Sequence, residues 1–450
     1  MPPSDFEALP RRRLFETIHH LAFERDWLFY ALLAGLAAQA VLLAVLVPWE
    51  RGSDSKEYLA LANALDMGLY GSVTAAGFEP EALRPPAYPA VIWLLVELLG
   101  LPLGAVIGVQ LLLYLCCLVA LSRWLKVLRY GREAFLALNL IYVFPAIYIS
   151  GIMTEAWAMA VMTATVLLAI KPPTTARLMT IGLVAGIGAL FRPDLVLLPV
   201  AVAIALALTR GPALRLLIPV AVSGLMLLPF ALYNKAYFGR LTPIPVASGT
   251  GNSLYMSTWQ HRLSQDDLNS FYFKKPTPRT FELGLAQDVA RLNAKIGADP
   301  YTAPWHPKGY PDRAREIRSS SVFRQAAKER IAADPTAYAA HVIGNVWNIW
   351  NTKTYPETLP WIGKLFLGFI SGAMTILGLS GAAVTLLQPK SWPVPRAMAL
   401  IFGYVPAVQI WFHGEGRYTS AVRPLLVLFA VVLIHQLVTR LLARNSPAAT

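Results

Sequence analysis

The stretch WLFYALLAGLAAQAVLLAVLVPWERGSDSKEYLALANAL, residues 27–65, decides the fold class. Residues 27–48 carry no charged side chain, and a helix needs about 20 apolar residues to cross a bilayer. Polar residues follow directly, with Asp54 ahead of an amphipathic helical pattern at 58–65. The stretch therefore predicts a first membrane-spanning helix, followed by a polar loop and a short surface helix.

The composition extends this prediction to the whole chain. Of 450 residues, 56% are hydrophobic and 14% are charged, and the mean hydropathy is +0.50. A soluble domain is about a quarter charged, so the composition indicates a polytopic, all-α membrane protein. The net charge of +13 comes from short basic clusters between apolar runs, which indicates topology signals and argues against a nucleic-acid partner.

Ten apolar runs are interpreted as membrane-spanning helices. They are residues 27–48, 104–128, 134–150, 156–170, 178–191, 195–208, 214–233, 361–387, 397–412 and 421–442. A further run, 88–99, is short and opens with RPPAYP, residues 84–89, so we interpret it as a helix that dips into the outer interface and returns. With that choice every short loop on one side of the membrane is basic, as the cytoplasmic side requires.

This topology predicts four regions. Residues 1–26 form a cytoplasmic N-terminal segment, and 27–233 form a transmembrane module with a catalytic first external loop at 49–89. Residues 234–360 form a mostly helical external subdomain, and 361–450 contain the C-terminal transmembrane helices. Both termini are expected in the cytoplasm, with the polar loops on the periplasmic face of a bacterial inner membrane.

Ionisable residues gather on the predicted outer face. Asp54 follows the first span, although Ser53, Asp54 or Ser55 could equally cap the next helix. Glu155 opens a span, where a carboxylate needs a partner, a metal ion or a water-filled cavity. If the Asp54 and Glu155 side chains meet, they could hold a divalent cation, Mg²⁺ or Mn²⁺.

Three arginines on the same face are candidates for binding a phosphate. Arg84 precedes two prolines, Arg192 lies in FRPD, and Arg417 lies in GEGRY. A guanidinium group offers forked donors that match phosphate oxygens, whereas the alternative is an arginine that anchors the membrane boundary. The segment ASGTGNSLYMST, 247–258, could bring backbone amides close to an anion. Further candidates for the substrate pocket are Tyr58, Tyr88, Asn252, Tyr255, Glu415 and Tyr418.

The order of these motifs resembles one family. An aspartate after the first span, YLALANAL, RPPAYP, an acid after the third span, RP and EGRYTSAVRPLLVLFA follow one another from about residue 27 to 442. This resembles the GT-C glycosyltransferases that use polyprenyl-phosphate sugars, in the branch of aminoarabinose transferase and protein O-mannosyltransferases. Many members carry a doubled acid in the first loop, whereas here Ser55 follows Asp54.

The resemblance implies roles for the candidates. Asp54 would act as general base on the acceptor hydroxyl, Glu155 would help to form the acceptor or metal site, and the three arginines would surround the donor phosphate. A hexosyl or pentosyl group would move from a polyprenyl-phosphate donor to a lipid, glycan or protein acceptor, with inversion, in synthesis of the cell envelope.

Three other functions remain open. A lipid-linked sugar flippase or other transporter would need paths to both faces and often has inverted repeats, which this sequence lacks. An O-antigen ligase or polymerase would use a diphosphate-linked glycan. A non-catalytic scaffold would use the external subdomain for docking. Walker, Rossmann and zinc-hydrolase motifs are absent, so a nucleotide donor bound in one of those folds is not expected.

Overall fold

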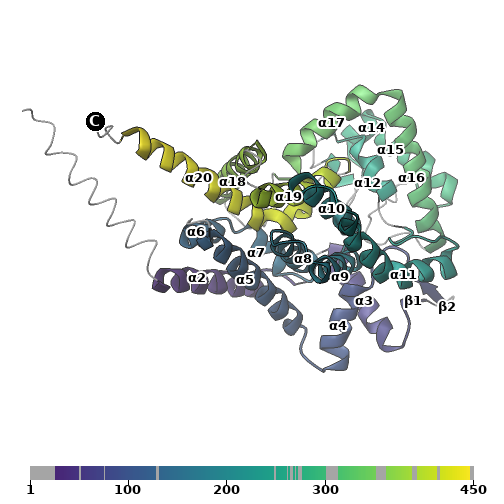
Figure 1. The fold of residues 1–450 in the computed structure, drawn as a ribbon. Helices are drawn as coiled ribbons and strands as arrows, with labels where there is room; N and C mark the ends of the chain where they lie inside the picture. The colour runs from purple at the N-terminus through teal and green to yellow at the C-terminus, as the bar shows by residue number, and fades with distance from the viewer. Residues whose placement is uncertain are drawn as a thin grey trace, which may run out of the picture.

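The structure is a computed structural model. It describes residues 26–49, 52–74, 77–127, 131–247, 250–260, 262–263, 267–268, 270–271, 276–300, 313–350, 361–387, 393–412 and 416–445. The described chain is predominantly helical, with one two-stranded antiparallel sheet (Figure 1). The candidate Glu415 and nearly all of the predicted N-terminal segment lie outside the described residues.

The N-terminal module contains most of the helices. They are α2 (Asp26–Leu46), α3 (Gly52–Asp66), α4 (Ala87–Ile92), the π-helix η1 (Trp93–Leu98), α5 (Gly104–Val127), α6 (Arg132–Ile141), α7 (Phe144–Ile149), α8 (Glu155–Ala169), α9 (Thr175–Phe191), η2 (Pro193–Leu195), α10 (Leu198–Arg210), η3 (Leu214–Leu217) and α11 (Ile218–Phe238). Strands β1 (Gly71–Thr74) and β2 (Gly77–Pro80) pair between α3 and α4, with Ser72 opposite Glu79.

The remaining helices form the predicted external subdomain and the C-terminal part. The subdomain contains α12 (Thr250–Ser257), α14 (Pro278–Glu282), α15 (Leu285–Ile296), α16 (Arg313–Ala333) and α17 (Pro335–Asn348). The C-terminal part contains α18 (Trp361–Leu387), α19 (Pro393–Gln409), the 3₁₀ segment η4 (Gly416–Val422) and α20 (Arg423–Asn445). In Figure 1 the green helices of the subdomain lie at one side, whereas α2 and the end of α20 point to the other.

The chain is a multi-pass membrane protein. Six stretches of the described helices are long and apolar enough to cross a bilayer: Trp27–Leu46, Gly104–Lys126, Pro193–Arg210, Leu214–Phe238, Gly363–Leu387 and Gly416–Leu441. Three shorter apolar stretches accompany them: Ala87–Leu98, Glu155–Ala169 and Thr175–Phe191. The predicted helical membrane architecture is confirmed, but the count of ten spans is not.

One predicted span is broken. Residues 134–150 were expected to be continuous, but α6 ends at Ile141 and α7 begins at Phe144. Pro145 lies in the first turn of α7, where a ring without an N–H is tolerated, and it could not continue the hydrogen bonding of α6. The break leaves Tyr142 fixed between two short helices. Its buried side chain contacts Arg423 at the start of α20.

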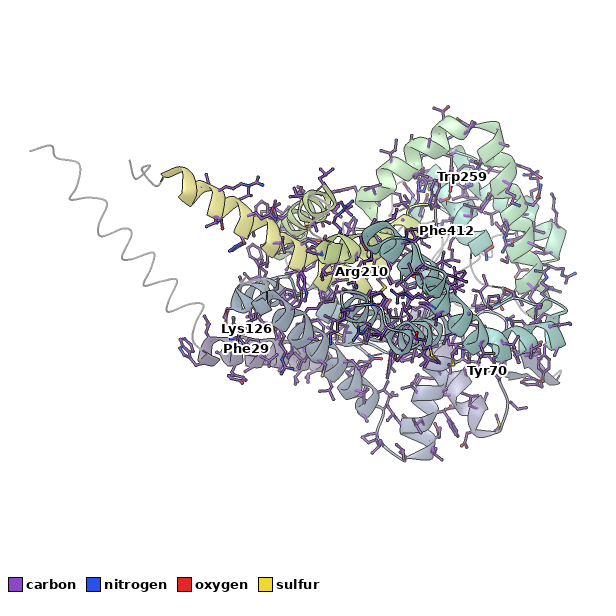
Figure 2. The ribbon with its side chains drawn as sticks, in the orientation of Figure 1. Phe29, Tyr70, Lys126, Arg210, Trp259 and Phe412 are labelled. Atoms are coloured by element: carbon purple, nitrogen blue, oxygen red, sulfur yellow. The ribbon has the colours of Figure 1, made fainter. Side chains whose placement is uncertain are left out.

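Segments predicted to be external meet at one end of the helices. The Ile152 amide donates to the Trp49 carbonyl at 2.8 Å, and the Ala247 amide donates to the Ala82 carbonyl at 2.8 Å. Figure 2 shows Tyr70 and Trp259 towards the side of the subdomain, and Lys126, from a predicted cytoplasmic loop, towards the opposite side. The arrangement therefore gathers the polar loops that the sequence analysis placed on one face.

Candidate active site

Asp54 lies in the first turn of α3, and its helix is attached to the segment that precedes Glu155. The buried hydroxyl of Ser55 donates to the Ile152 carbonyl at 3.0 Å. A hydroxyl can donate to a carbonyl, whereas an ionised carboxylate at this position could only accept. Ser55 thus joins the two segments that carry Asp54 and Glu155.

Arg84 is held in place by the backbone around it. The buried carboxylate of Glu81 accepts from the amides of Leu83 and Arg84, at 2.6 and 2.8 Å. The Tyr70 hydroxyl donates to the Arg84 carbonyl at 2.5 Å. Two prolines follow Arg84 and restrict the backbone before α4 begins. The guanidinium group therefore extends from a fixed backbone.

Asp54 contacts two of the three predicted arginines. Its Oδ1 lies 2.6 Å from Nη2 of Arg84, and its Oδ2 lies 3.1 Å from Nη1 of Arg417. Arg84 also contacts Glu57, with Nε 2.6 Å from the carboxylate. Burial alone would raise the pKa of Asp54, but the charges and hydrogen bonds of Arg84 and Arg417 outweigh it and hold the pKa well below its usual range.

These side chains are partly accessible. The exposed fraction is 20% for Asp54, 18% for Arg84 and 25% for Arg417. A ligand can therefore reach the ion pairs without unfolding of the surrounding helices. This distinguishes them from ion pairs that are sealed inside the protein.

A second charged group forms around Arg192, at the end of α9. Its Nη1 lies 3.6 Å from Oε1 of Glu155, and its fork donates to both oxygens of Asp194, at 2.9 and 3.2 Å. Asp194 is fixed in turn, since its Oδ2 accepts from Gln409 at 2.7 Å. The buried Oε2 of Glu155 has no hydrogen-bond partner among the described residues. An unsatisfied buried carboxylate oxygen is costly, and a bound hydroxyl would relieve that cost.

Aromatic rings border the two charged groups. The Tyr418 ring lies 5.2 Å from the guanidinium carbon of Arg417 and 6.0 Å from that of Arg192. The Tyr58 ring lies 5.3 Å from the guanidinium carbon of Arg84. It also packs edge-on against the Tyr88 ring, with the ring centroids 4.9 Å apart. Tyr58 and Tyr418 therefore lie beside the charged residues, and Tyr88 packs against Tyr58.

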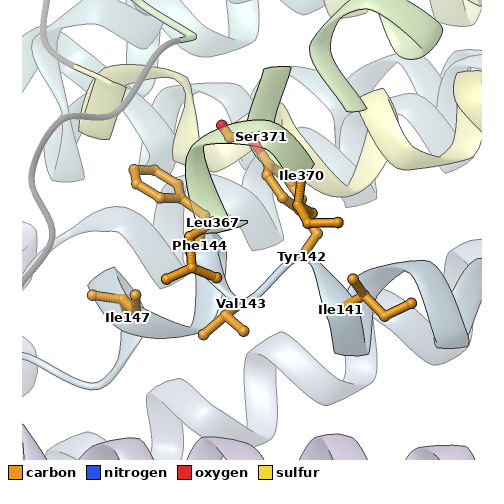
Figure 3. A pocket seen from close by; sticks show the side chains of 8 residues that line it. All are labelled: Ile141, Tyr142, Val143, Phe144, Ile147, Leu367, Ile370 and Ser371. Atoms are coloured by element: carbon orange, nitrogen blue, oxygen red, sulfur yellow. The ribbon is translucent and has the colours of Figure 1, made fainter. Parts of the chain in front are cut away.

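Arg423 holds the segment that carries Arg417. It is fully buried, and its Nη2 donates to the carbonyls of Trp350 and Gly416, each at 3.1 Å. Its guanidinium carbon lies 3.8 Å above the Phe144 ring. Figure 3 shows Phe144 and Tyr142 facing Leu367 and Ile370 of α18. Arg423 thus fixes the start of η4 against the break between α6 and α7.

Two predicted pocket residues lie elsewhere. The Tyr255 hydroxyl donates to Asp288 at 2.6 Å, and the Asn252 side chain accepts from Ser319 at 3.4 Å. Both belong to α12, whose face packs on α16 within the core of the predicted external subdomain. Residues 250–257 of the segment are therefore a packed helix. Gly251 is required there because an added Cβ would lie 1.9 Å from the Ser320 carbonyl.

The predicted cation site has no ready set of ligands. Among the described residues no group of three or more His, Cys, Asp or Glu side chains could hold a metal ion. Both oxygens of Asp54 face arginines, and one oxygen of Glu155 faces Arg192. A resident Mg²⁺ or Mn²⁺ ion would have to displace a guanidinium group from Asp54, and it would find one unpaired carboxylate oxygen, Oε2 of Glu155, so these residues do not fit it.

Several site residues were missed by the sequence analysis. Glu57, Glu81, Gln409 and Arg423 carry no sequence signal that separates them from ordinary surface or boundary residues. Asp194 had a signal, since it lies two positions after Arg192 on the predicted outer face. It forms the closest carboxylate contact of that arginine among the described residues.

No protein-family model matches the chain, and no curated protein matches it. Among solved structures, it is similar to an oligosaccharyltransferase, AglB, from Archaeoglobus fulgidus, in complex with an inhibitory peptide and a dolichol-phosphate. The identity is 16%, the TM-score is 0.46, and the match covers 95% of this chain and 52% of that one.

It is also similar to ArnT from Cupriavidus metallidurans bound to undecaprenyl phosphate. Here the identity is 12%, the TM-score is 0.38, and the match covers 95% of this chain and 82% of the other. AglB and ArnT are GT-C glycosyltransferases, the class that the sequence resembles. The chain spans about half the length of the archaeal enzyme. At such identities the likeness concerns the fold, and the function is inferred from residues of this chain.

Proposed function

We propose that the chain is a GT-C-type glycosyltransferase that moves a sugar from a polyprenyl-phosphate donor to a hydroxyl group of a lipid, glycan or protein acceptor. The observation that supports it best is the Asp54 carboxylate, which lies between Arg84 and Arg417 at 2.6 and 3.1 Å. Arginines match the phosphate of such a donor, and a carboxylate can take the proton of the acceptor hydroxyl.

The donor phosphate would compete with Asp54 for its arginines. In the structure the pKa of Asp54 is well below its usual range, since Arg84 and Arg417 overcome the effect of burial. A carboxylate in that state is a weak base. When the arginines turn to the phosphate, the Asp54 carboxylate loses these partners and its basicity rises.

The reaction is then a single displacement. The acceptor hydroxyl oxygen attacks the anomeric carbon, while the bond from that carbon to the phosphate oxygen breaks. The proton of the hydroxyl passes to the Asp54 carboxylate, and the polyprenyl phosphate leaves with the bonding electron pair. Arg84 and Arg417 stabilise the negative charge that develops on the leaving phosphate. Attack from the opposite face inverts the anomeric configuration.

The second charged group would place the acceptor. Oε2 of Glu155 has no partner among the described residues and can accept a hydrogen bond from an acceptor or sugar hydroxyl. Arg192 supplies a positive charge 3.6 Å from that carboxylate, and Asp194 fixes the guanidinium plane. Glu155 is thereby assigned to positioning of a hydroxyl, and Arg192 to charge balance.

The proposed location is the periplasmic face of a bacterial inner membrane. The polyprenyl tail would stay in the bilayer while its phosphate reaches the interface. The basic loops predicted for the opposite face support this orientation, as does the gathering of Asp54, Arg84, Arg192 and Arg417 at the end where the polar loops meet.

Purified protein in lipid nanodiscs, supplied with polyprenyl-phosphate sugars and candidate acceptors, tests the proposal. We expect release of polyprenyl phosphate and a product of inverted anomeric configuration by NMR. Release of a diphosphate would indicate a ligase. Movement of intact donor across a vesicle membrane without cleavage would indicate a flippase, and either result would refute the proposed reaction.

A further inference from the structure

Helix α17 has an exposed face unlike that of α16, the helix before it. On α16 the exposed side chains include Arg324 and Lys328, as expected of a helix surface in water. The sequence of α17, PTAYAAHVIGNVWN, contains no Asp, Glu, Lys or Arg. Its exposed face carries large apolar side chains: Ile343 is 74% exposed, and Val346 and Trp347 are each 44% exposed. A face of this kind marks a contact with another protein or with a membrane.

The opposite face of α17 binds the segment that follows α19. The side-chain amide of Asn345 donates to the carbonyls of Ile410 and Phe412, at 3.0 and 2.8 Å. The Tyr338 hydroxyl donates to the Trp411 carbonyl at 2.7 Å. At a wet surface, water can satisfy carbonyls beyond a helix end, whereas at membrane depth the protein must supply the donors. The side chains of α17 supply them here.

The C-terminal end of α17 lies beside a membrane-spanning stretch. Cη2 of Trp347 lies 3.8 Å from the position that a Cβ on Gly372 would occupy. Gly372 is nine residues after Gly363, where the apolar stretch of α18 begins, and nine residues correspond to about 14 Å along a helix. A headgroup layer is only about 5–8 Å thick on each side of the hydrocarbon core. Trp347 therefore contacts α18 beyond the depth of a headgroup layer.

The exposed faces of α17 and α18 are continuous. Leu365 and Phe369 lie seven and three positions before Gly372, so they occupy the same side of α18 as Gly372 does. Both side chains are exposed, and Trp347 borders this side of the helix. The apolar face of α17 thus extends an apolar surface of α18, and that surface faces lipid because α18 is long and apolar enough to cross the bilayer.

We propose that α17 is an interfacial helix whose exposed face lies in the outer leaflet of the bilayer. Ile343, Val346 and Trp347 contact acyl chains and the inner part of the headgroup layer, where tryptophan side chains are favoured. A protein partner or a second copy of the chain would also suit an apolar face, but the depth of Trp347 beside α18 favours lipid. The water-exposed part of the predicted external subdomain then ends near Ala333, the last residue of α16.

This location connects the bilayer to the candidate active site. Asn345 fixes the backbone that follows α19, and Gln409 at the end of α19 donates to Asp194 beside Arg192. A helix anchored in lipid would hold these residues at a constant depth relative to the headgroups. The placement of α17 does not depend on the proposed glycosyl transfer, because it rests on exposure and contacts alone.

Spin labels on introduced cysteines test the location, in full-length protein reconstituted in lipid nanodiscs. The background is Cys116→Ser, because Cys116 is exposed whereas Cys117 is buried. A label at Ile343→Cys reports on α17, and a label at Lys328→Cys on α16 is the matched control, since both positions are exposed. EPR power saturation measures the collisions of each label with oxygen, which concentrates in lipid, and with a nickel chelate, which stays in water.

We expect the label at Ile343→Cys to collide with oxygen more often, and with the nickel chelate severalfold less often, than the label at Lys328→Cys. Val346→Cys, on the same face of α17, should agree with Ile343→Cys and controls for a local disturbance by one label. Equal access of the nickel chelate to α17 and α16 would show that α17 lies in water and would overturn the proposal. Low access of both reagents to α17 would indicate a protein partner or a second copy on this face, and would equally overturn it.

Discussion

The variant Asp54→Asn distinguishes two possible roles of Asp54. The residue could be the general base, or it could only hold Arg84 and Arg417 in place. The asparagine has nearly the same size and keeps one acceptor oxygen for Arg84 or Arg417, but it has no charge and cannot take a proton at neutral pH. Arg84 retains its 2.6 Å contact with Glu57 in this variant. The arrangement of the helices should therefore survive, whereas the proposed proton transfer should not.

The expected effects follow from the contacts. Loss of a general base lowers kcat by about 10²–10⁴-fold, which is about 3–5 kcal/mol of transition-state free energy. Loss of a charged partner costs about 1–3 kcal/mol of stability, and the lower end applies because the Asp54 side chain is 20% exposed. The effect on rate should thus exceed the effect on stability.

The assay is release of polyprenyl phosphate under saturating donor and acceptor, together with a thermal unfolding curve for each protein. Asp66→Asn is the matched control, because it makes the same chemical change at an exposed position at the end of the same helix. It should keep wild-type turnover. If Asp54→Asn also turns over within ten-fold of the wild type, a rate loss below the about 10²-fold expected of a base, Asp54 is not the base.

Four further results are expected. Arg84→Lys replaces a fork that contacts two carboxylates by a single ammonium group, and should lower kcat/KM for the donor about ten-fold in a donor titration; an unchanged titration would exclude Arg84 from the phosphate site. Because the pKa of Asp54 lies below its ordinary value of 3.8, the stability that the wild type has over Asp54→Asn should be complete above about pH 4 and decrease as the pH falls further, in thermal unfolding measured against pH; a difference that grows on acidification would contradict this. Gly251→Ala should lower the unfolding temperature, since its Cβ would lie 1.9 Å from the Ser320 carbonyl, and an unshifted melting curve would disprove that contact. Excess EDTA should leave the transfer rate unchanged, because arginines already balance both carboxylates; loss of activity that Mg²⁺ or Mn²⁺ restores would show a metal requirement.

The sequence singled out the residue types of the candidate site and predicted the face on which they lie. Arginines on the outer side of a membrane protein run against the usual charge bias, so Arg84, Arg192 and Arg417 stood out before any contact was known. The loop order then placed them with Asp54 and Glu155. The structure brings these five residues into two groups of ion pairs. Asp54 pairs with Arg84 and Arg417, and Glu155 pairs with Arg192 at 3.6 Å.

A local sequence pattern could not predict which residues from distant parts of the chain form pairs. Asp54 and Arg417 are 363 positions apart, so no periodicity connects them. The short Gly-rich segment near Gly251 was misleading for a related reason. Glycine serves a flexible anion-binding loop and a close helix contact equally well, and only the position of Ser320 on α16 decides between them.

The charge balance of the site links donor binding to activation of the base. Arg84 is held by two carboxylates, each at 2.6 Å, whereas Arg417 approaches Asp54 at 3.1 Å. A phosphate entering the site should therefore draw Arg417 away from Asp54 more readily than it draws Arg84 away. Once that happens, Asp54 keeps one arginine of two, and its pKa rises towards the range of a useful base. A donor without a phosphate would leave both contacts intact. In the proposed reaction, the phosphate that leaves is thus also the group that frees Asp54 to act as a base. A hydroxyl bound at Glu155 is therefore deprotonated only when a donor is present.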